Sequence, residues 1–293
     1  MMILRTQGYN LTSVCNFVGI SRQAYHKRLQ KHSTKDVLYQ SLEQLVINNR
    51  QVKSRAGLRT IYHKEQLSSL LGINQFEQQM SERGFALKPY RSFIKTTDSR
   101  GHHYKFDNLI TGIDISGENQ VIVGDITYYQ NRSGLYYIFQ FQDYYTLEIK
   151  GLVGSNNMEG INAEKCLRQV FAYNKQRGYN QLLIMHTDGG SQYRSLKFQK
   201  MLRVAQIRPS HAKNCLENGL SERTNGIVKN EYLVDYDIKS IHHLNIILSK
   251  IKYQVNEVWP SKALGYKPPK QYAQWTRNMK INERPVKTVK TVE

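Results

Sequence analysis

Hydrophobic residues in the first part of the chain recur with the spacing of helices. An apolar stripe over residues 11–18 predicts a short helix that ends at Gly19, and Ser21 can cap a second helix over 22–31. Further amphipathic helices are expected over residues 36–50, 57–70 and 76–83. The pattern therefore predicts an all-α N-terminal region.

The first two of these helices form a helix-turn-helix pattern. A glycine turn joins them, and the second would bury Tyr25 and Leu29. Its other positions carry mostly basic or amide side chains that could contact DNA: Arg22, Gln23, His26, Lys27 and Arg28. The alternative is an ordinary pair of antiparallel helices with a solvated basic face.

From residue 119 the hydrophobic pattern changes to that of strands. Strands are expected over 120–129, 135–141 and 146–153, followed by a helix over 159–177, a strand over 182–185, a helix over 196–204, a strand-like piece from 207 and a helix over 241–255. This order predicts a mixed α/β fold rather than a helical bundle or an all-β domain.

Pattern and composition together divide the chain into five segments. The expected segments are a helix-turn-helix DNA-binding unit (1–34), a second helical unit that binds DNA or only packs (35–88), a basic linker (89–118), the α/β domain (119–275) and a flexible tail (276–293).

Charge changes the picture from a generic α/β protein to a partner of nucleic acid. The 42 Lys and Arg residues outnumber the 23 Asp and Glu residues, giving a net charge of +19. A protein this basic usually binds a polyanion, although charge that only maintains solubility is the alternative. The three cysteines are far apart, which argues against disulfides and zinc, and no apolar run could span a bilayer. We therefore expect an intracellular protein, without a membrane segment, that binds DNA.

Three carboxylates stand out as candidates for a shared site. Asp125 interrupts an apolar strand, Asp188 follows the next buried strand, and Glu222 lies on a helix expected over 214–233. The polar residues Asn218, Asn225 and Lys229 share a face of that helix with Glu222, at spacings of i, i+4, i+7 and i+11. Each carboxylate alone has a structural alternative: a strand-end Asp, a helix N-cap or a solvated helix residue.

The donor chemistry of these carboxylates indicates a hard metal ion. Three carboxylates without a cysteine suit Mg²⁺ or Mn²⁺ rather than zinc. Two such ions can activate an attacking oxygen and stabilise a leaving one in phosphoryl transfer.

Three blocks of sequence resemble a known family. GDITYY (124–129), HTDGGSQY (186–193) and NCLENGLSERTNGIVKNEYL (214–233) are similar to the blocks of IS-three type insertion-sequence transposases, which have a retroviral-integrase-type core and are encoded by a second reading frame. QAYHKRL (23–29) and ALGYKPPKQY (263–272) fit the same group.

This resemblance implies a ribonuclease-H-like core, a mixed five-stranded sheet with flanking helices, preceded by the helix-turn-helix region. It implies that Asp125, Asp188 and Glu222 bind two Mg²⁺ or Mn²⁺ ions and are catalytic, and that Lys229 contacts DNA near the scissile phosphate. His186, Asn218 and Asn225 would support the site. For His186 a structural hydrogen-bonding role is the favoured alternative to direct catalysis.

The chain departs from the family pattern in two places. The spacer between Asp188 and Glu222 is shorter than usual, and the loss falls around 207–213. Trp259 and Ser261 stand where the group usually has Arg and His, and a Trp cannot replace an Arg as a phosphate ligand.

The resemblance implies a DDE transposase that cleaves DNA and transfers strands in the transposition of an insertion element. The expected partners are the terminal inverted repeats of the element, target DNA and further copies of the chain. An upstream-frame protein with its own helix-turn-helix and coiled coil could be fused to it, and the expected location is the prokaryotic cytoplasm, at the nucleoid. The alternatives are an inactive, transposase-derived DNA-binding repressor and a ribonuclease-H-class nuclease that only hydrolyses.

Overall fold

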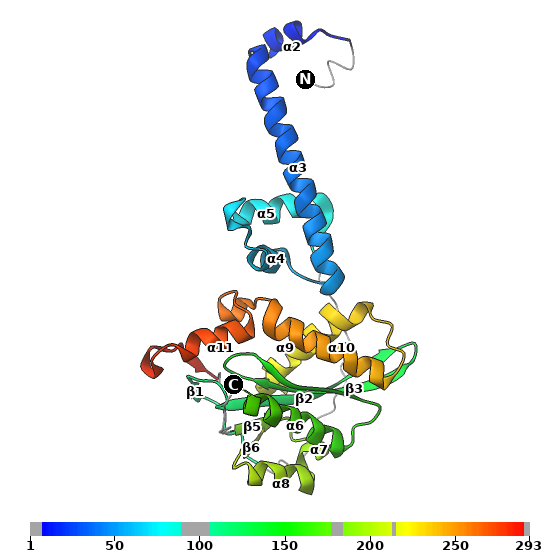
Figure 1. Ribbon diagram of the computed structural model, residues 1–293, viewed down its shortest axis with the longest axis vertical. Helices are drawn as coiled ribbons and strands as arrows, with labels where there is room; N and C mark the ends of the chain where they lie inside the picture. The colour runs from blue at the N-terminus through cyan, green and yellow to red at the C-terminus, as the bar shows by residue number, and fades with distance from the viewer. Residues whose placement is uncertain (1–7, 89–105, 177–183, 213–214, 290–293) are drawn as a thin grey trace.

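The computed structural model describes residues 8–88, 106–176, 184–212 and 215–289. It contains a helical N-terminal part that projects from an α/β core (Figure 1). Most of the predicted basic linker, residues 89–105, lies outside the described residues. No described helix combines the length and the apolar character needed to cross a bilayer.

The helix-turn-helix pattern begins as predicted. Helix α2 spans Leu11–Val18, and Gly19 ends it in the left-handed conformation, with φ of 71°. Ser21 caps the next helix, since its Oγ accepts a hydrogen bond from the Ala24 amide at 3.1 Å.

The second helix is much longer than predicted. Helix α3 spans Arg22–Val52 as one continuous element, so the separate helices expected over 22–31 and 36–50 are wrong, and the predicted boundary at residue 34 lies inside α3. No Gly or Pro interrupts this stretch, and polar residues do not stop a solvated helix. Tyr25 is buried as predicted, but Leu29 is exposed because the outer half of α3 stands clear of the molecule (Figure 1).

The remaining N-terminal helices pack beside the inner half of α3. Helix α4 spans Leu58–Lys64, a 3₁₀ turn follows over Leu67–Ser69, and α5 spans Ile73–Met80 before a wide turn at Ser81–Phe85. Val46, Ile61, Phe76 and Met80 are fully buried between them. The helix predicted over 57–70 therefore ends at residue 64 and is followed by a separate 3₁₀ turn, and the one predicted over 76–83 is confirmed with bounds shifted three residues toward the N-terminus.

The core contains the predicted mixed sheet of five strands. The strands are β2 (Val121–Asn131), β3 (Gly134–Asp143), β4 (Ile149–Ser155), β5 (Ile184–Thr187) and β6 (Arg208–His211). Their order is β4-β3-β2-β5-β6, with antiparallel pairing from β4 to β2 and parallel pairing from β2 to β6. The strand-like piece expected from residue 207 is β6.

Helices cover both faces of this sheet. On one face lie α6 (Gly160–Gln176), α7 (Ser191–Arg194) and α8 (Leu196–Val204), which bury Phe139 and Phe141 of β3. On the other face lie α9 (Gly219–Ile227) and α10 (Ile241–Tyr253). Alternate residues of β2 and β3 therefore face either an apolar layer or α9 and α10.

The C-terminal segment was predicted only in part. Helix α11 spans Pro269–Arg277, and β7 (Lys287–Thr288) pairs with β1 (Asp114–Ile115). Val289 is buried, so the flexible tail expected over 276–293 is wrong as far as residue 289, and 290–293 lie outside the described residues. A two-residue strand has too little pattern to be recognised when its partner is so distant in sequence.

The helical part and the core share one apolar cluster. It combines residues of α3, α4 and α5 with Tyr232, Leu248 and Trp259 of the core. Two further contacts join the same parts. Lys53 Nζ lies 2.7 Å from Glu231 Oε2, and the rings of His63 and Tyr266 stack with their centroids 3.8 Å apart.

Candidate active site

The sheet places the first two candidate carboxylates side by side. Asp125 lies in β2 and Asp188 directly follows β5, which is the parallel neighbour of β2. Val123 pairs with His186 in this ladder, and each aspartate comes two residues later. Asp125 is half-buried and Asp188 is exposed.

The third candidate carboxylate, Glu222, comes from a helix rather than from the sheet. It is exposed on α9, which lies over β2 and β3. The pKa of Asp125 is raised to about 7, mainly by burial and also by the negative charges of Asp188 and, less strongly, Glu222. The three predicted carboxylates therefore share one electrostatic environment.

The helix predicted over 214–233 is not continuous. A 3₁₀ turn over Cys215–Asn218 leads into α9, and a π-helical turn over Val228–Tyr232 follows. The polar face nevertheless reaches the site: Asn225 Nδ2 donates to Asp125 Oδ2 at 2.7 Å, and Asn218 Nδ2 donates to the Gly124 carbonyl at 3.1 Å. Both asparagines thus tie α9 to β2.

Lys229 lies in the π-helical turn and remains close to the carboxylates. Its Nζ is 5.3 Å from the centroid of the Tyr128 ring, and its side chain is half-buried. Burial lowers the pKa of Lys229, while the charge of Asp125 opposes that shift.

His186 is fully buried on β5 rather than open to the site. Its Nδ1 lies 2.9 Å from Ser210 Oγ, and Ser210 also accepts the Leu109 amide at 2.8 Å. Burial lowers the pKa of His186 to about 4, and the nearby Glu217 opposes that shift. This environment favours the structural interpretation over direct catalysis.

The described residues contain no ready-made group of three or more His, Cys, Asp or Glu side chains that could hold a metal ion. Asp125, Asp188 and Glu222 offer only carboxylate oxygens, the donors preferred by Mg²⁺ and Mn²⁺. A divalent cation among them would offset the repulsion that raises the pKa of Asp125.

Several residues at the site were missed by the sequence interpretation. Gln140 and Gln142 of β3 and Thr224 of α9 are buried between helix and sheet. Tyr193 is buried under the carboxylates, and burial, together with Asp188 and Asp125, raises the pKa of its phenol well above the usual value. The sequence signal that could have indicated these residues is the pair of glutamines, Gln140 and Gln142, at alternate positions of an otherwise apolar strand.

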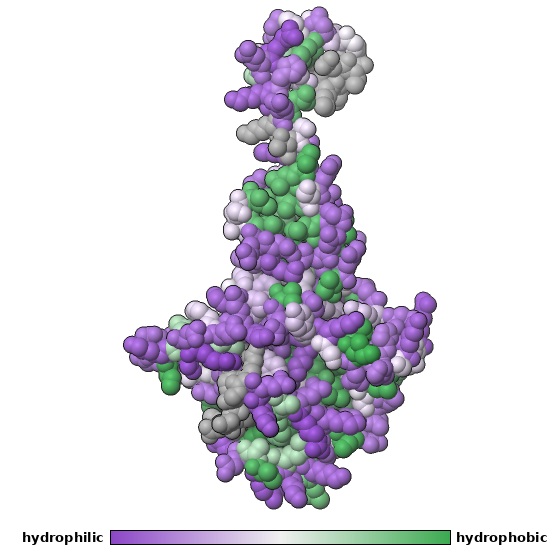
Figure 2. Space-filling model, viewed as in Figure 1, coloured by the Kyte–Doolittle hydropathy of each residue, from purple (hydrophilic) through white to green (hydrophobic). Residues whose placement is uncertain are grey.

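The predicted DNA-contacting residues of the helix-turn-helix are all exposed on the first two turns of α3. They are Arg22, Gln23, His26, Lys27 and Arg28. The structure keeps them together at the outer end of the molecule, far from the sheet, on a largely hydrophilic surface (Figures 1 and 2).

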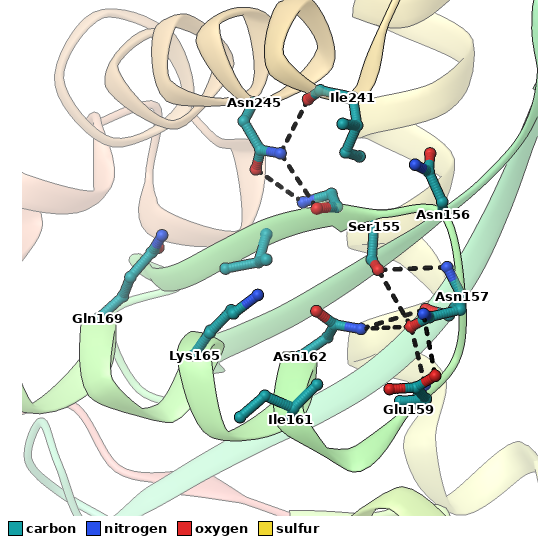
Figure 3. Close-up of a pocket in the computed structure, with 12 residues that line it drawn as sticks. Ser155, Asn156, Asn157, Glu159, Ile161, Asn162, Lys165, Gln169, Ile241 and Asn245 are labelled. Carbon is teal, nitrogen blue, oxygen red and sulfur yellow. Dashed lines mark hydrogen bonds between the residues drawn. The ribbon is translucent and has the colours of Figure 1, made fainter.

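A separate hollow lies between the β4–α6 connection and α10, and none of the predicted site residues lines it (Figure 3). Its amides already serve the edge of the sheet: Asn245 Oδ1 accepts the Gly154 amide at 2.9 Å, and its Nδ2 donates to the Gly154 carbonyl at 3.0 Å. Gln169 accepts the Leu152 amide in the same way. These side chains form hydrogen bonds with backbone groups of the edge strand β4 that have no neighbouring strand to pair with.

Comparison with known proteins agrees with this geometry. Residues 116–214 match a family model described as an integrase core domain, and residues 203–269 match a second model with that description. The transposase for insertion sequence element IS904 of Lactococcus lactis is 28% identical over 66% of this chain and 76% of its own. The transposase InsF for insertion sequence IS3A of Escherichia coli is 24% identical over 71% of this chain and 73% of its own.

A solved structure of the HTLV-2 integrase catalytic core domain in complex with magnesium is 22% identical, covers 54% of this chain and 97% of its own, and has a TM-score of 0.42. The five-stranded mixed sheet with helices on both faces is the ribonuclease-H-like arrangement that the sequence resemblance implied. The two integrase-core matches follow one another from residue 116 to residue 269 and include all three carboxylates. The chain therefore belongs to the insertion-sequence transposases of the IS3 type, enzymes with an integrase core domain.

Proposed function

We propose that this transposase cleaves the ends of its insertion element and joins them to target DNA with Asp125, Asp188 and Glu222 as its catalytic carboxylates. The observation that carries this proposal is their approach to one another from β2, the end of β5 and α9. The charges of Asp188 and Glu222 contribute to the raised pKa of Asp125. Isolated structural carboxylates would not influence one another in this way.

The three carboxylates would hold two Mg²⁺ or Mn²⁺ ions. When bound, the ions would supply Lewis-acid activation of the attacking oxygen and stabilisation of the leaving oxygen. The fit rests on the all-oxygen donor set and on the mutual repulsion of the carboxylates.

The neighbouring side chains would orient this site and the DNA. Asn225 fixes one oxygen of Asp125, and Asn218 fixes the start of α9 on β2. Lys229, whose ammonium lies over Tyr128 and within the field of Asp125, would contact a phosphate beside the scissile bond.

Two successive displacements at phosphorus would occur at this site. Water first attacks a phosphodiester at the element end, one P–O bond forms, another breaks, and a 3′-hydroxyl is released. That hydroxyl then attacks a phosphodiester of the target, so one P–O bond again replaces another and a target 3′-hydroxyl leaves. No covalent bond between protein and DNA is required.

The N-terminal part would recognise the element ends. The exposed basic and amide residues of α3 are suited to the major groove, and the net charge of +19 would attract the phosphate backbone. Further copies of the chain would assemble on the two ends, and an upstream-frame helix-turn-helix and coiled-coil protein could act as a fusion partner.

A strand-joining assay with Mg²⁺ and a duplex carrying the element end tests this proposal. Joined product should disappear in Asp125→Asn, Asp188→Asn and Glu222→Gln, while binding of the duplex is retained. Robust joining by all three variants would overturn the catalytic assignment. Nicks without joining would instead identify a hydrolytic nuclease, and binding without cleavage by the unmodified protein would identify a repressor.

A further inference from the structure

The helix that carries Glu222 packs on the sheet through polar side chains. The fully buried residues of α9 are Ser221, Thr224 and Asn225, whereas its large apolar side chains, Leu220 and Ile227, are only partly buried. Polar packing is less stabilising than apolar packing, but hydrogen bonds fix direction and distance. The position of Glu222 therefore depends on which groups receive these bonds.

Two glutamines of β3 form hydrogen bonds with α9, one as acceptor and one as donor. Thr224 Oγ1 donates to Gln142 Oε1 at 2.6 Å, and Gln140 Nε2 donates to the Ser221 carbonyl at 2.8 Å. The amide of Gln142 is itself oriented, since its Nε2 donates to the Leu147 carbonyl at 2.8 Å. Both glutamine side chains are almost fully buried.

The pairing of strands connects these glutamines to the catalytic aspartate. Gln140 is the cross-strand partner of Asp125, and Gln142 is the partner of Val123. Paired residues of antiparallel strands point to the same face of the sheet. One cross-strand pair thus presents the Asp125 carboxylate and the amide that holds the backbone next to Glu222.

The interface between α9 and β3 leaves polar atoms without hydrogen bonds, which an apolar interface would not do. Among the described residues, Gln140 Oε1 and Ser221 Oγ are buried without a partner. A buried unpaired polar atom is unfavourable, and such features concentrate where function requires a particular arrangement.

We propose that Gln140 and Gln142 are positioning residues for Glu222: they set the place of α9 on the sheet and thereby the distance of its carboxylate from Asp125. This inference rests on the proposed catalytic role of Glu222. Neither glutamine touches the reacting atoms, and each acts through α9.

The test uses the full chain bound to a duplex with a pre-cleaved element end. Single-turnover joining is followed, and Mn²⁺ binding to the same complex is measured by electron paramagnetic resonance. Thr224→Val and Gln142→Leu should each slow joining about tenfold and raise the Mn²⁺ concentration for half-saturation, because one buried hydrogen bond no longer holds α9. Thr224→Ser keeps the hydroxyl and should behave like the unmodified protein.

Gln169→Leu is the matched control. It removes a hydrogen bond that Gln169, an exposed glutamine of α6, accepts from the Leu152 amide of β4, and should leave the joining rate and Mn²⁺ half-saturation unchanged. If a single variant does not fold, Thr224→Val combined with Gln142→Leu removes both partners and should fold, yet join slowly.

Unchanged joining and unchanged Mn²⁺ half-saturation in Thr224→Val and Gln142→Leu would overturn the inference. Glu222→Gln, assayed alongside, distinguishes failure of the positioning role from failure of the catalytic role of Glu222. If it is inactive while the positioning variants are fully active, only the positioning role fails. If it is active, the catalytic role of Glu222 fails first.

Discussion

At the scale of single residues, the contact between Asn225 and Asp125 gives a sharp test of local electrostatics. Asn225 Nδ2 donates to Asp125 Oδ2 at 2.7 Å, and this bond favours the charged carboxylate. Asn225→Ala should slow strand joining about tenfold, because one hydrogen bond of a charged group is lost. Asn225→Asp should be slower still, because a fourth carboxylate would face Asp125.

Single-turnover joining rates at saturating Mg²⁺ measure this order. Asn245→Ala serves as the control, since the hydrogen bonds of Asn245 within the described part of the chain go to Gly154 and to its own helix. Equal rates for the Ala and Asp variants would contradict the electrostatic explanation.

The three candidate carboxylates could be singled out from the sequence because each lies in a distinctive block. Asp125 interrupts an apolar strand and Asp188 directly follows one, patterns that single-sequence reasoning can detect. Gln142 and Thr224 could not be paired in this way, since nothing local links two residues that are distant in sequence. Likewise, the burial of His186 depends on β6 and on the loop at Leu109.

At the scale of elements, two glycines of β4 set how closely helices approach the sheet from either side. A Cβ on Gly151 would lie 2.5 Å from the Cys166 carbonyl oxygen of α6, whereas a Cβ on Gly154 would meet the Leu244 side chain of α10 at 2.7 Å. A backbone atom cannot move without shifting its helix, but a leucine side chain can change rotamer.

Gly151→Ala should therefore lower the free energy of unfolding by about 1–3 kcal/mol, and Gly154→Ala by less. Denaturant titration measures both values. Gly219→Ala is the control, because a Cβ there meets nothing within 4 Å. A Gly154→Ala variant less stable than Gly151→Ala would show that Leu244 is held more rigidly than the α6 backbone.

Element boundaries were predictable where the chain carries a stop signal and wrong where it does not. Gly19 ends α2 as expected, and α8 spans the predicted residues. The polar residues around position 34 lack such a signal, so α3 continues through them. A 3₁₀ turn at Cys215–Asn218 leads directly into α9, which lies on the sheet.

At the scale of the whole molecule, Trp259 lies where the helical part meets the core. Its side chain is buried at the junction of the helical part and the core, with Lys53 Nζ 5.0 Å and Lys64 Nζ 5.2 Å from its ring. Both lysines come from the N-terminal part, so cation–π contacts and apolar burial join it to the core. Trp259 thus makes a docking contact at a position where the sequence resemblance led us to expect an Arg.

Substituting the residue usual in the family, Trp259→Arg, should therefore separate the two parts. A guanidinium at this position would lie beside Lys53 and Lys64, whose neighbouring carboxylates Glu231 and Glu65 are already paired with them, and the buried ring would be lost. The expected result is a loss of about 3 kcal/mol in the free energy of unfolding. Amide hydrogen exchange should also become faster in α4 and in the turn at Gln254–Val258, which meet at this junction.

Trp259→Phe is the matched control, since it keeps an aromatic face for both lysines and removes the indole N–H, which has no hydrogen-bond partner among the described residues. It should retain most of the protection from exchange. Joining of element ends should fall in Trp259→Arg more than binding of the same ends, because the helix-turn-helix surface of α3 stays intact while its connection to the core is loosened. Unchanged exchange in Trp259→Arg would mean that the ion pair of Lys53 with Glu231 and the stacking of His63 on Tyr266 are sufficient to hold the two parts together.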